Sequence, residues 1–483
     1  MAHAMKKIAF LCLFLAVNGY VIAQGQYNNW HFGNGSSIHF SPGAAVTNNS
    51  QIVSSSACAS ISDTLGNLLF YTNGDTVWSS DNTIMPNGTG LFGNSNVQQG
   101  VLIVPNPDTS NSKNQYYIFT IGSPIDGTAK ELRYSIVDMN LNGFLGAIDS
   151  SSKNILLDSN VTEKLTATKN SNGIDFWVVS RNLGSGLFKA YSITKNGINT
   201  EPVVSNAGLP IQNGDYSGAI KISNNGCWMI ATTKGIFKDP ALVELLHFDN
   251  SYGSVSSGFS TTSIHHPYGL EFSPDNTKFY IGQNDESPVY QFNLNEEEDK
   301  NILPSQLAVS DIYSATYAFQ AAPDGRIYFV TQDSSSLGCI RNPGNYSLYC
   351  NVDSFAIVGL NHTTYCLPNN FNLTYKGALS CADKIQGCRL PLNKFMPNAF
   401  TPNGDGLNDC FGVSQIIKDS LPFIDFAIFD RWGNKVFYTT NIADCWDGMY
   451  KGKLSDQANY VYYIREKTDC GYAFQTGYVI LIR

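Results

Sequence analysis

The residues best placed to do chemistry lie near the C-terminus, in the stretch TPNGDGLND from Thr401 to Asp409. Asn403, Asp405 and Asp409 carry side-chain oxygens of the kind that converge on Ca²⁺ in calcium-binding loops. However, Thr401 stands where such a loop would begin with a carboxylate, and Gly412 stands where it would end with glutamate. The same residue types favour Asx turns, in which the side chain accepts a nearby backbone N–H. We interpret the stretch as Asx turns first and as a calcium site second.

Signatures of catalysis are sparse. The sequence holds no HExxH, no GxSxG, no phosphate-binding glycine loop and no dinucleotide fingerprint. His265 and His266 are adjacent, so on a strand they would face opposite sides and could not share a metal without a bend. We interpret them as loop histidines. In a functional role, one of them would lie with Asp215 or Asp239 at the rim of the repeat domain described below.

The cysteines point to an oxidising compartment. Of eleven cysteines, Cys12 lies in the N-terminal segment, and nine of the other ten lie at or beyond Cys227. An even number in an exported chain favours disulfides, and Cys339 with Cys350 or Cys381 with Cys388 would close short loops. Connectivity does not follow from the sequence. A zinc site is disfavoured because no CxxC spacing occurs.

The N-terminus has the order of a signal peptide. Lys6 and Lys7 precede an apolar run at 8–17, and small residues then predict cleavage between Ala23 and Gln24. Ten apolar residues are too few for a membrane span, which needs about 20. We therefore expect a chain that reaches the periplasm, has no transmembrane segment when mature, and is then secreted or held at the cell surface.

The composition excludes one class of partner. Charged residues are 14% of the chain and the formal charge is −9, which argues against a nucleic-acid partner because such partners require a basic face. Glycine is abundant, with 42 residues. Together with many asparagines and tyrosines, this favours strands and turns over helices.

A turn-like cluster recurs about every fifty residues, and each copy precedes a short apolar strand. The key positions of the copies are 66, 114, 173, 226, 276 and 325. Asn, Asp and Gly supply the positive φ that a tight hairpin needs. Several strands per fifty residues without helices indicate the blades of an all-β propeller. A β-helix or a pair of sandwiches fits this period less well.

The length of the repeat region gives the number of blades. Residues 24–376 divided by about fifty give seven blades, whereas six turn copies are visible, so six is the alternative. The seventh blade would be composite, with residues 28–40 pairing beside a last segment at 371–375. Such closure would hide the free edges of the sheet.

A second unit follows a change in composition. Strands are expected at 424–430, 433–440, 459–466 and 472–483, which predicts a small Ig-like antiparallel β-sandwich. Trp432 and Trp446 are expected to fill its core. The expected organisation is a signal peptide at 1–23, a propeller at 24–376, a cysteine-containing linker at 377–388 and this domain at 389–483.

The C-terminal motifs NAFTPNGDGLND, FDRWGNKVF, WDGMYKGK and GYVILIR resemble the gliding-motility-associated C-terminal domain. This is the type B sorting signal of the type IX secretion route of Bacteroidetes, so the resemblance implies the type IX machinery as a partner. Cys410, Cys445 and Cys470 lie inside these motifs, where a local disulfide would add to the fold. The motif residues are Asn398, Phe400, Thr401, Pro402, Asn403, Gly404, Asp405, Gly406, Asn408, Asp409, Arg431, Trp432, Gly433, Trp446, Asp447 and Gly448.

The repeat region also resembles secreted Bacteroidetes proteins with a WD40- or YVTN-like propeller. The resemblance lies in NNWHFGNG (28–35), ISDTLGNLLFYTNGDTVW (61–78), IMPNGTGLFG (84–93) and LPNNFN (367–372). It implies an architecture but no chemistry.

Two functions therefore remain open. The favoured one is a non-catalytic binding or adhesion protein that meets a carbohydrate or protein ligand on the propeller face. The alternative is a secreted enzyme acting on polymers, a glycan hydrolase or lyase. Titratable side chains gathered at the propeller's axial mouth would favour the enzyme.

Overall fold

The computed structural model describes residues 25–483 apart from 109–113, 124–129, 212–216, 236–240, 286–287, 297, 311–313, 332–333, 372, 374–395, 413–422, 442 and 469–470. The predicted signal peptide, with Ala23 and Gln24 at its cleavage site, lies outside the described residues.

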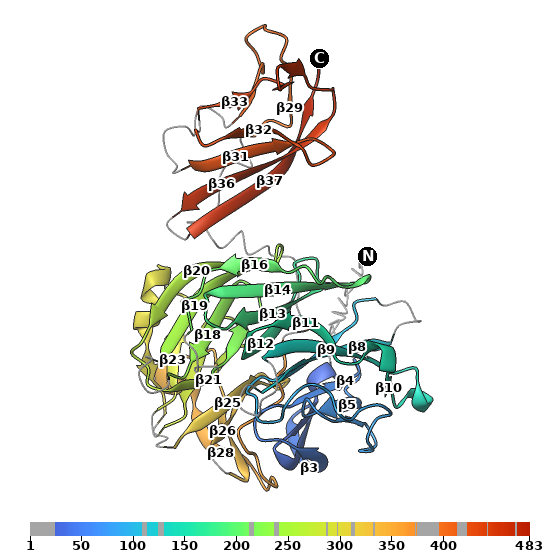
Figure 1. Cartoon of the computed structure of the whole chain (residues 1–483). Coiled ribbons are helices and arrows are strands. Elements are labelled where there is room, and N and C mark those ends of the chain that lie inside the picture. The colour runs from blue at the N-terminus through green and yellow to red at the C-terminus, as the bar shows by residue number, and fades with distance from the viewer. Residues whose placement is uncertain are drawn as a thin grey trace, which may run out of the picture.

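Seven antiparallel sheets follow one another between residues 29 and 358, and they form the blades of a β-propeller (Figure 1). Blade 1 contains β1 (Asn29–Phe32), β2 (Asn34–Ser41) and β3 (Ala44–Val53), and blade 2 contains β4 (Ala59–Ser62), β5 (Leu68–Thr72) and β6 (Val77–Ser79). Blade 3 contains β7 (Val101–Pro105), β8 (Gln115–Ile121), β9 (Glu131–Asp138), β10 (Ala147–Ile148) and β11 (Ile155–Ser159). Blade 4 contains β12 (Val161–Lys169), β13 (Phe176–Asn182), β14 (Leu187–Thr194), β15 (Gly197–Ile198) and β16 (Val203–Asn206).

The last three blades have four strands each. Blade 5 contains β17 (Ile220–Ile222), β18 (Trp228–Thr233), β19 (Leu242–Asp249) and β20 (Ser254–Thr261). Blade 6 contains β21 (Pro267–Phe272), β22 (Lys278–Gln283), β23 (Tyr290–Asn293) and β24 (Leu307–Ala308). Blade 7 contains β25 (Thr316–Ala321), β26 (Ile327–Thr331), β27 (Ser336–Ile340) and β28 (Val352–Val358).

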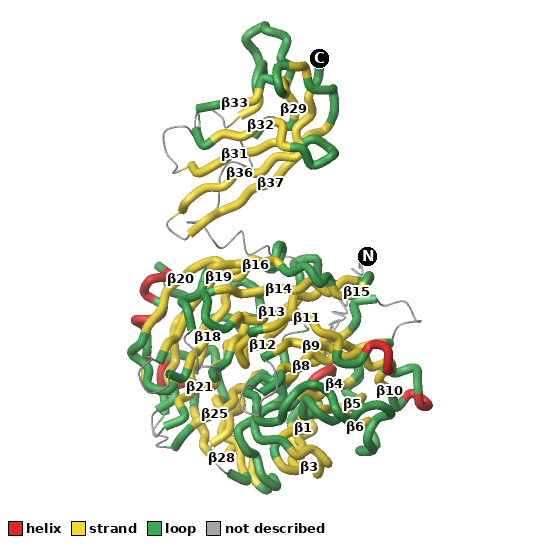
Figure 2. Tube along the Cα trace, in the orientation of Figure 1, coloured by secondary structure: helices red, strands yellow, loops and turns green. Residues whose placement is uncertain are grey.

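The helical elements in the described part of the propeller are short 3-10 turns, drawn in red in Figure 2. They are η1 (Gly25–Tyr27), η2 (Asn142–Phe144), η3 (Ser150–Ser152), η4 (Asp299–Asn301), η5 (Leu303–Ser305) and η6 (Ser347–Cys350).

The recurring turns have the backbone conformation that the sequence predicts. Gly66, Gly173, Gly226, Asn276 and Gly325 all have positive φ, between 58° and 92°. The strand after each turn is covered on both faces; all six residues of β22, for example, are buried. The first strands of successive blades from β1 to β25 contact one another, so the blades stand side by side around an axis.

The expected composite blade is wrong. Blade 1 takes its three strands from residues 29–53 alone, because β2 and β3 form their own hairpin at Gly43 (φ 84°). The ring closes instead by side-chain packing between blades 1 and 7, where Trp30 and Tyr328 meet with ring centroids 6.0 Å apart. Phe371 lies outside any strand and packs inside the propeller, against Tyr27 and Phe176.

After blade 7 the chain turns back into the ring as residues 360–371, which we call the closing segment. It first borders blade 1, where Asn34 N donates to His362 O (2.8 Å). It then contacts blade 7, where Thr363 N donates to Ser334 O (3.0 Å), and the stretch before blade 2, where Tyr365 N donates to Ser55 O (2.9 Å). Its last part reaches the axis.

The C-terminal domain is built on a five-stranded sheet in the order β29 (Ala399–Phe400), β37 (Gly471–Leu481), β36 (Asn459–Thr468), β31 (Phe423–Phe429) and β32 (Lys435–Thr439). Two small sheets complete it, formed by β30 (Phe411–Gly412) with β33 (Cys445–Trp446) and by β34 (Met449–Tyr450) with β35 (Lys453–Leu454). The β30–β33 pair covers one face of the main sheet. There Phe411 packs on Phe426 and Tyr462, with ring centroids 5.8 and 5.3 Å away.

Candidate functional site

The axis of the propeller is occupied by the end of the closing segment. Asn369 Nδ2 donates to Val101 O (3.2 Å) in blade 3 and to Leu165 O (3.0 Å) in blade 4. Its backbone N–H donates to Cys58 O (2.9 Å) beside blade 2. One buried side chain thus joins the inner strands of two blades, and its own backbone joins a third.

A buried ion pair lies next to this asparagine. Lys221 Nζ in blade 5 is 3.1 Å from Glu271 Oε2 in blade 6, and it donates to Gln320 Oε1 (2.7 Å) in blade 7 and to Asn370 O (3.0 Å). Glu271 also accepts the backbone N–H groups of Phe272 and Ala321. The charges on both side chains are therefore paired and hydrogen-bonded, as burial requires.

Two glutamines before β7 cross the axis to blade 5. Gln99 pairs in both directions with the backbone of Ile220: Oε1 accepts N–H at 2.8 Å and Nε2 donates to O at 3.0 Å. Gln98 Oε1 accepts Gly218 N (2.8 Å), while Gln98 N donates to Glu163 Oε2 (3.0 Å). Burial raises the pKa of Glu163, and the Gln98 hydrogen bond only partly offsets this.

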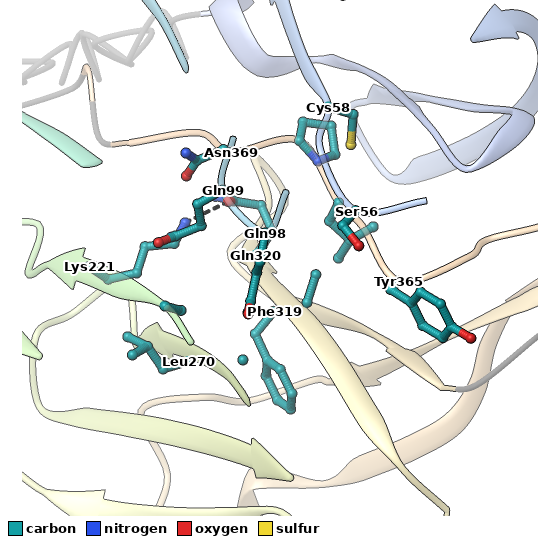
Figure 3. Close-up of a pocket in the computed structure, with 15 residues that line it drawn as sticks. Ser56, Cys58, Gln98, Gln99, Lys221, Leu270, Phe319, Gln320, Tyr365 and Asn369 are labelled. Atoms are coloured by element: carbon teal, nitrogen blue, oxygen red, sulfur yellow. Dashed lines mark hydrogen bonds between the residues drawn. The ribbon is translucent and has the colours of Figure 1, made fainter. Parts of the chain in front are cut away.

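These groups leave little room between them. The cavity at the axis has a volume of about 30 Å³ and is lined by Gln98, Gln99, Lys221, Gln320 and Asn369, with Cys58 beside them (Figure 3). A buried water occupies about 30 Å³ of liquid volume, whereas small-molecule sites measure roughly 300–1,000 Å³. The cavity therefore suits a water molecule and not a sugar ring.

The sequence analysis did not single out these axial residues, although a signal for them exists. Lys221, Glu271 and Gln320 each lie five residues before the key turn position of their repeat, at 226, 276 and 325. The strands around them are otherwise apolar (IKI, LEF and FQA). A polar residue at the same repeat position in three successive blades places all three at the axis.

The adjacent histidines His265 and His266 are not among the residues that line the axial cavity. His265 and His266 are exposed and come directly before β21, where His266 has φ 45° and its carbonyl accepts Asn284 N (3.2 Å). This agrees with loop histidines. Asp215 and Asp239, their expected partners, lie outside the described residues. The described residues contain no group of three or more His, Cys, Asp or Glu side chains able to hold a metal.

The expected disulfide between Cys339 and Cys350 is wrong, because both are free and buried. The spacing in the sequence gives the separation of the two residues but not the direction of their side chains. Cys350 interacts with the hydroxyl of Tyr280, whereas Cys339 lies within β27 opposite Asp353. Burial raises the pKa of Cys339 to about 12.

The remaining cysteines differ in state. A disulfide joins Cys410 to Cys445 in the C-terminal domain, two of the three cysteines for which a local disulfide was expected. Cys227 is also disulfide-bonded. Cys381, Cys388 and Cys470 lie outside the described residues.

The stretch from Thr401 to Asp409 forms nested Asx turns. The Asp409 carboxylate accepts the backbone N–H groups of Asn403 (3.0 Å), Gly404 (2.6 Å) and Gly406 (2.7 Å). Asp405 accepts Leu407 N (2.8 Å), and the hydrogen bond from Asn403 Nδ2 holds the pKa of its carboxyl below the ordinary value. The side chains expected to bind calcium are therefore engaged with the loop's own backbone.

Other motif residues serve the fold of the loop and the sheet. Thr401 N donates to Asn408 O (2.9 Å), Asn398 O accepts Ile480 N (2.9 Å) from β37, and Asp447 Oδ1 accepts Met449 N (2.9 Å). Gly448 has φ 76°, and a Cβ there would lie 3.2 Å from both Pro402 and Leu481.

The two motif tryptophans have different environments. Trp446 is buried against Phe400, with ring centroids 5.3 Å apart, and its Nε1 donates to Met449 O (2.9 Å). The core position expected for Trp432 is wrong, because its side chain is 76% exposed. It occupies the β31–β32 turn, in which Asp430 accepts Trp432 N and Gly433 has φ 80°.

A hollow lined by three basic side chains and by the carboxylates of Asp430 and Asp456 adjoins this turn. Arg431 Cζ lies 5.1 Å from the centre of the Trp432 ring. The hollow has a volume of about 630 Å³, and Arg431, Trp432, Tyr450, Lys451 and Lys453 are among its lining residues. It is large enough for a peptide side chain or a small polar ligand.

Fold and site together define a seven-bladed β-propeller joined to a small β-domain that carries many of its motif residues in exposed turns and buries Phe400 and Trp446 in its core. Residues 394–481 match the CHU_C type IX secretion signal domain. The C-terminal domain is therefore a type IX secretion signal domain, and the protein is secreted or located at the cell surface. No helix among the described residues is long and apolar enough to span a membrane.

Several solved propeller structures are similar to this chain. A putative 6-phosphogluconolactonase from Bacteroides fragilis has 12% identity and a TM-score of 0.33, with 56% of this chain and 72% of that one covered. Virginiamycin B lyase from Staphylococcus aureus has 12% identity, a TM-score of 0.34, and coverage of 63% and 83%. Kluyveromyces lactis Hsv2 has 10% identity, a TM-score of 0.35, and coverage of 65% and 92%. At these TM-scores the likenesses carry no conclusion about activity, and no curated protein sequence matches the chain.

Proposed function

We propose that the protein is an exported, non-catalytic binding protein whose propeller presents its outer loops to a carbohydrate or protein ligand. The state of the axis carries this proposal. Lys221, Glu271 and Gln99 are bonded to one another or to backbone, and the cavity of about 30 Å³ cannot admit a substrate. Asn369 Oδ1 and Asn370 Nδ2 are buried without a partner among the described residues. A glycan hydrolase or lyase needs titratable groups that reach the substrate.

A loop of blade 7 offers a surface for the ligand. Between β27 and β28, Tyr346, Leu348 and Tyr349 are 58%, 69% and 80% exposed. Gln291 of blade 6 fixes this loop, because its Nε2 donates to Asn345 O (2.7 Å) and its Oε1 accepts Ser347 N (2.9 Å). Exposed rings on a loop that is already ordered bind with little entropy loss.

A screen of the full mature chain tests this role. We expect binding on a glycan array or to a surface protein, and no release of soluble products from the same polymers. The double variant Tyr346→Ala/Tyr349→Ala should weaken binding at least tenfold. Tyr252→Ala, which removes a 68% exposed ring from the β19–β20 turn, should not. Depolymerisation of a glycan by the chain would support the enzyme alternative and end the binding proposal.

The export role has a candidate contact surface in the β31–β32 turn. Arg431 and Trp432 form an exposed cation–π pair on the hollow, where ring and guanidinium could meet a component of the type IX machinery. Lys435 and Tyr438 on β32 form a similar pair, with Nζ 4.6 Å from the ring centre, but do not line the hollow. The second pair is a matched control for the first.

Cell fractionation in a host with type IX secretion tests export. A chain cut after Gly387 should be cleaved at Ala23 and remain in the periplasm, and residues 389–483 should carry a folded reporter outside. Arg431→Ala/Trp432→Ala should reduce the exported fraction severalfold, while Lys435→Ala/Tyr438→Ala should not. Equal export of the cut and full chains would refute the role of the domain, and equal export of the two double variants would refute the contact surface.

A further inference from the structure

Two free cysteines from opposite ends of the propeller sequence lie together at the closure of the ring. Cys58 directly precedes β4 of blade 2, and Cys366 belongs to the closing segment. Both thiols are buried, each with 1% exposure. They share an apolar cluster with Trp30 and Tyr71 of blades 1 and 2.

The backbones on either side hold the two cysteines next to each other. Thr364 Oγ1 donates to Ser54 O (2.8 Å), and Tyr365 N donates to Ser55 O (2.9 Å). Beyond Cys366, Asn369 N donates to Cys58 O (2.9 Å). The closing segment therefore runs along residues 54–58 with hydrogen bonds on both sides of the cysteine pair.

The two thiols interact. Each of them perturbs the pKa of the other. Cys366 Sγ also accepts Gly33 N at 3.4 Å and lies 3.7 Å from Thr364 Oγ1. A disulfide needs sulfurs about 2.05 Å apart, so two buried thiols that interact on neighbouring, hydrogen-bonded backbones are well placed to form one.

The two thiols differ in acidity. Burial raises the pKa of Cys58 well above its ordinary value. Burial acts in the same direction on Cys366, but hydrogen bonds from Cys58, Gly33 and Thr364 outweigh it and lower the pKa of that thiol. In the seated segment, Cys366 therefore holds the larger fraction of thiolate, which is the reactive form.

We propose that Cys58 and Cys366 form a disulfide in the oxidising compartment that the exported chain enters, and that this bond covalently closes the propeller ring. The oxidant is an external disulfide, of a small thiol compound or of a thiol oxidoreductase. One of the two cysteine thiolates attacks one of its sulfurs, forming a mixed disulfide and releasing the first thiolate. The thiolate of the other cysteine then attacks the bonded Sγ atom and expels the second. Two thiols become one disulfide, and the external disulfide takes up the two electrons and two protons.

Burial sets the order of events. Once the closing segment is seated, an external disulfide cannot reach either sulfur, so exchange takes place as the segment docks. The finished bond is then shielded from reductants by the same packing. Cys339 and Cys350 serve as internal controls, because they are free and buried in the same propeller but have no cysteine partner in the described structure.

The experiment is peptide mapping of the full mature chain collected from the culture medium. The protein is denatured, alkylated without reduction, and digested. We expect a cross-linked peptide containing Cys58 and Cys366, two hydrogen masses below the sum of its parts, together with alkylated Cys339 and Cys350. Full alkylation of Cys58 and Cys366 would overturn the proposal.

A second measurement begins with the wild-type protein, so its main result does not depend on how the variants fold. In wild-type protein, a reductant present during urea unfolding should raise the unfolding constant of the propeller by roughly 10³-fold or more, because the bond closes a loop of most of the ring. Cys58→Ser/Cys366→Ser should already show the raised constant and keep only the sensitivity due to the disulfide of Cys227, whereas Cys339→Ser should keep the full sensitivity. Equal unfolding of wild-type propeller with and without reductant would also overturn the proposal.

Discussion

Replacing Asn369 tests the view that the closing segment is a structural plug of the axis. Asn369→Ala removes the two hydrogen bonds from its amide to Val101 O and Leu165 O. Both acceptors belong to inner strands of different blades, so the change loosens the join between blades 3 and 4. The backbone hydrogen bond to Cys58 O remains.

The expected loss follows from burial. Asn369 is 7% exposed, and each carbonyl that loses a donor away from water costs about 1–3 kcal/mol. The β-sheet still supplies one hydrogen bond to each carbonyl, so we expect a cost near the lower end of this range for each of them. Together with the small cavity left by the side chain, the total loss of stability should be about 2–4 kcal/mol. Asn361 is the matched control: its amide donates to Gly35 O (2.8 Å) at an exposed site, where loss costs about 0.5 kcal/mol or less.

The assay is urea unfolding of the mature chain read by pulse proteolysis, which follows the propeller fragment separately from the C-terminal domain. Asn369→Ala should shift the midpoint clearly, and Asn361→Ala should leave it nearly unchanged. A loss below about 1 kcal/mol for Asn369→Ala, or equal losses for both variants, would show that the segment does not hold the axis together.

Three further outcomes are expected. Burial lowers the pKa of His31 to about 3, so its contribution to stability is complete above pH 6.5 and falls by about 2 kcal/mol at pH 5. Urea titrations at pH 7 and pH 5 measure this loss of stability, which should be smaller in His31→Gln than in the wild type. Glu244→Gln breaks a buried ion pair with Arg181 and should cost about 3–5 kcal/mol in thermal unfolding, most of which Arg181→Met/Glu244→Leu should recover. Cys410→Ser removes the disulfide to Cys445, which closes a loop with a sequence separation of 35 residues, and should destabilise the C-terminal domain by about 3–4 kcal/mol. A reductant should destabilise the wild-type domain by the same amount and leave the variant unchanged.

The blades were predictable because turn chemistry is local. A residue such as Gly226 or Asn276 needs positive φ whatever surrounds it, and the strand that follows must be apolar when both faces are covered. Blade 1 escapes the repeat pattern because its first and second strands are joined by a tight turn at Gly33, without the longer Asn- and Asp-rich cluster that joins these strands in the other blades. The sequence therefore predicts a composite blade that the structure does not contain.

Side-chain direction was the part that the sequence could not supply. Trp432 and Trp446 have similar neighbours in sequence, yet one lies at the tip of a turn and the other under a sheet. Cys339 and Cys350 are near in sequence but face different partners, whereas Cys58 and Cys366 are far apart and meet. Such long-range placement depends on how the ring closes, which no local pattern encodes.

The way the ring closes also decides where function can reside. A ligand at the axis would have to displace Asn369 and Asn370, which removes the Asn370 carbonyl from the buried Lys221 ammonium. Losing a hydrogen bond to a buried charge costs about 1.5–3 kcal/mol before any contact with the ligand is made. Ligand contacts on the outer loops carry no such cost, because residues such as Tyr346 and Tyr349 are already exposed on an ordered backbone. Selection for binding would therefore act on the outer loops, while the axial residues Lys221, Glu271 and Gln320 would be retained for closure.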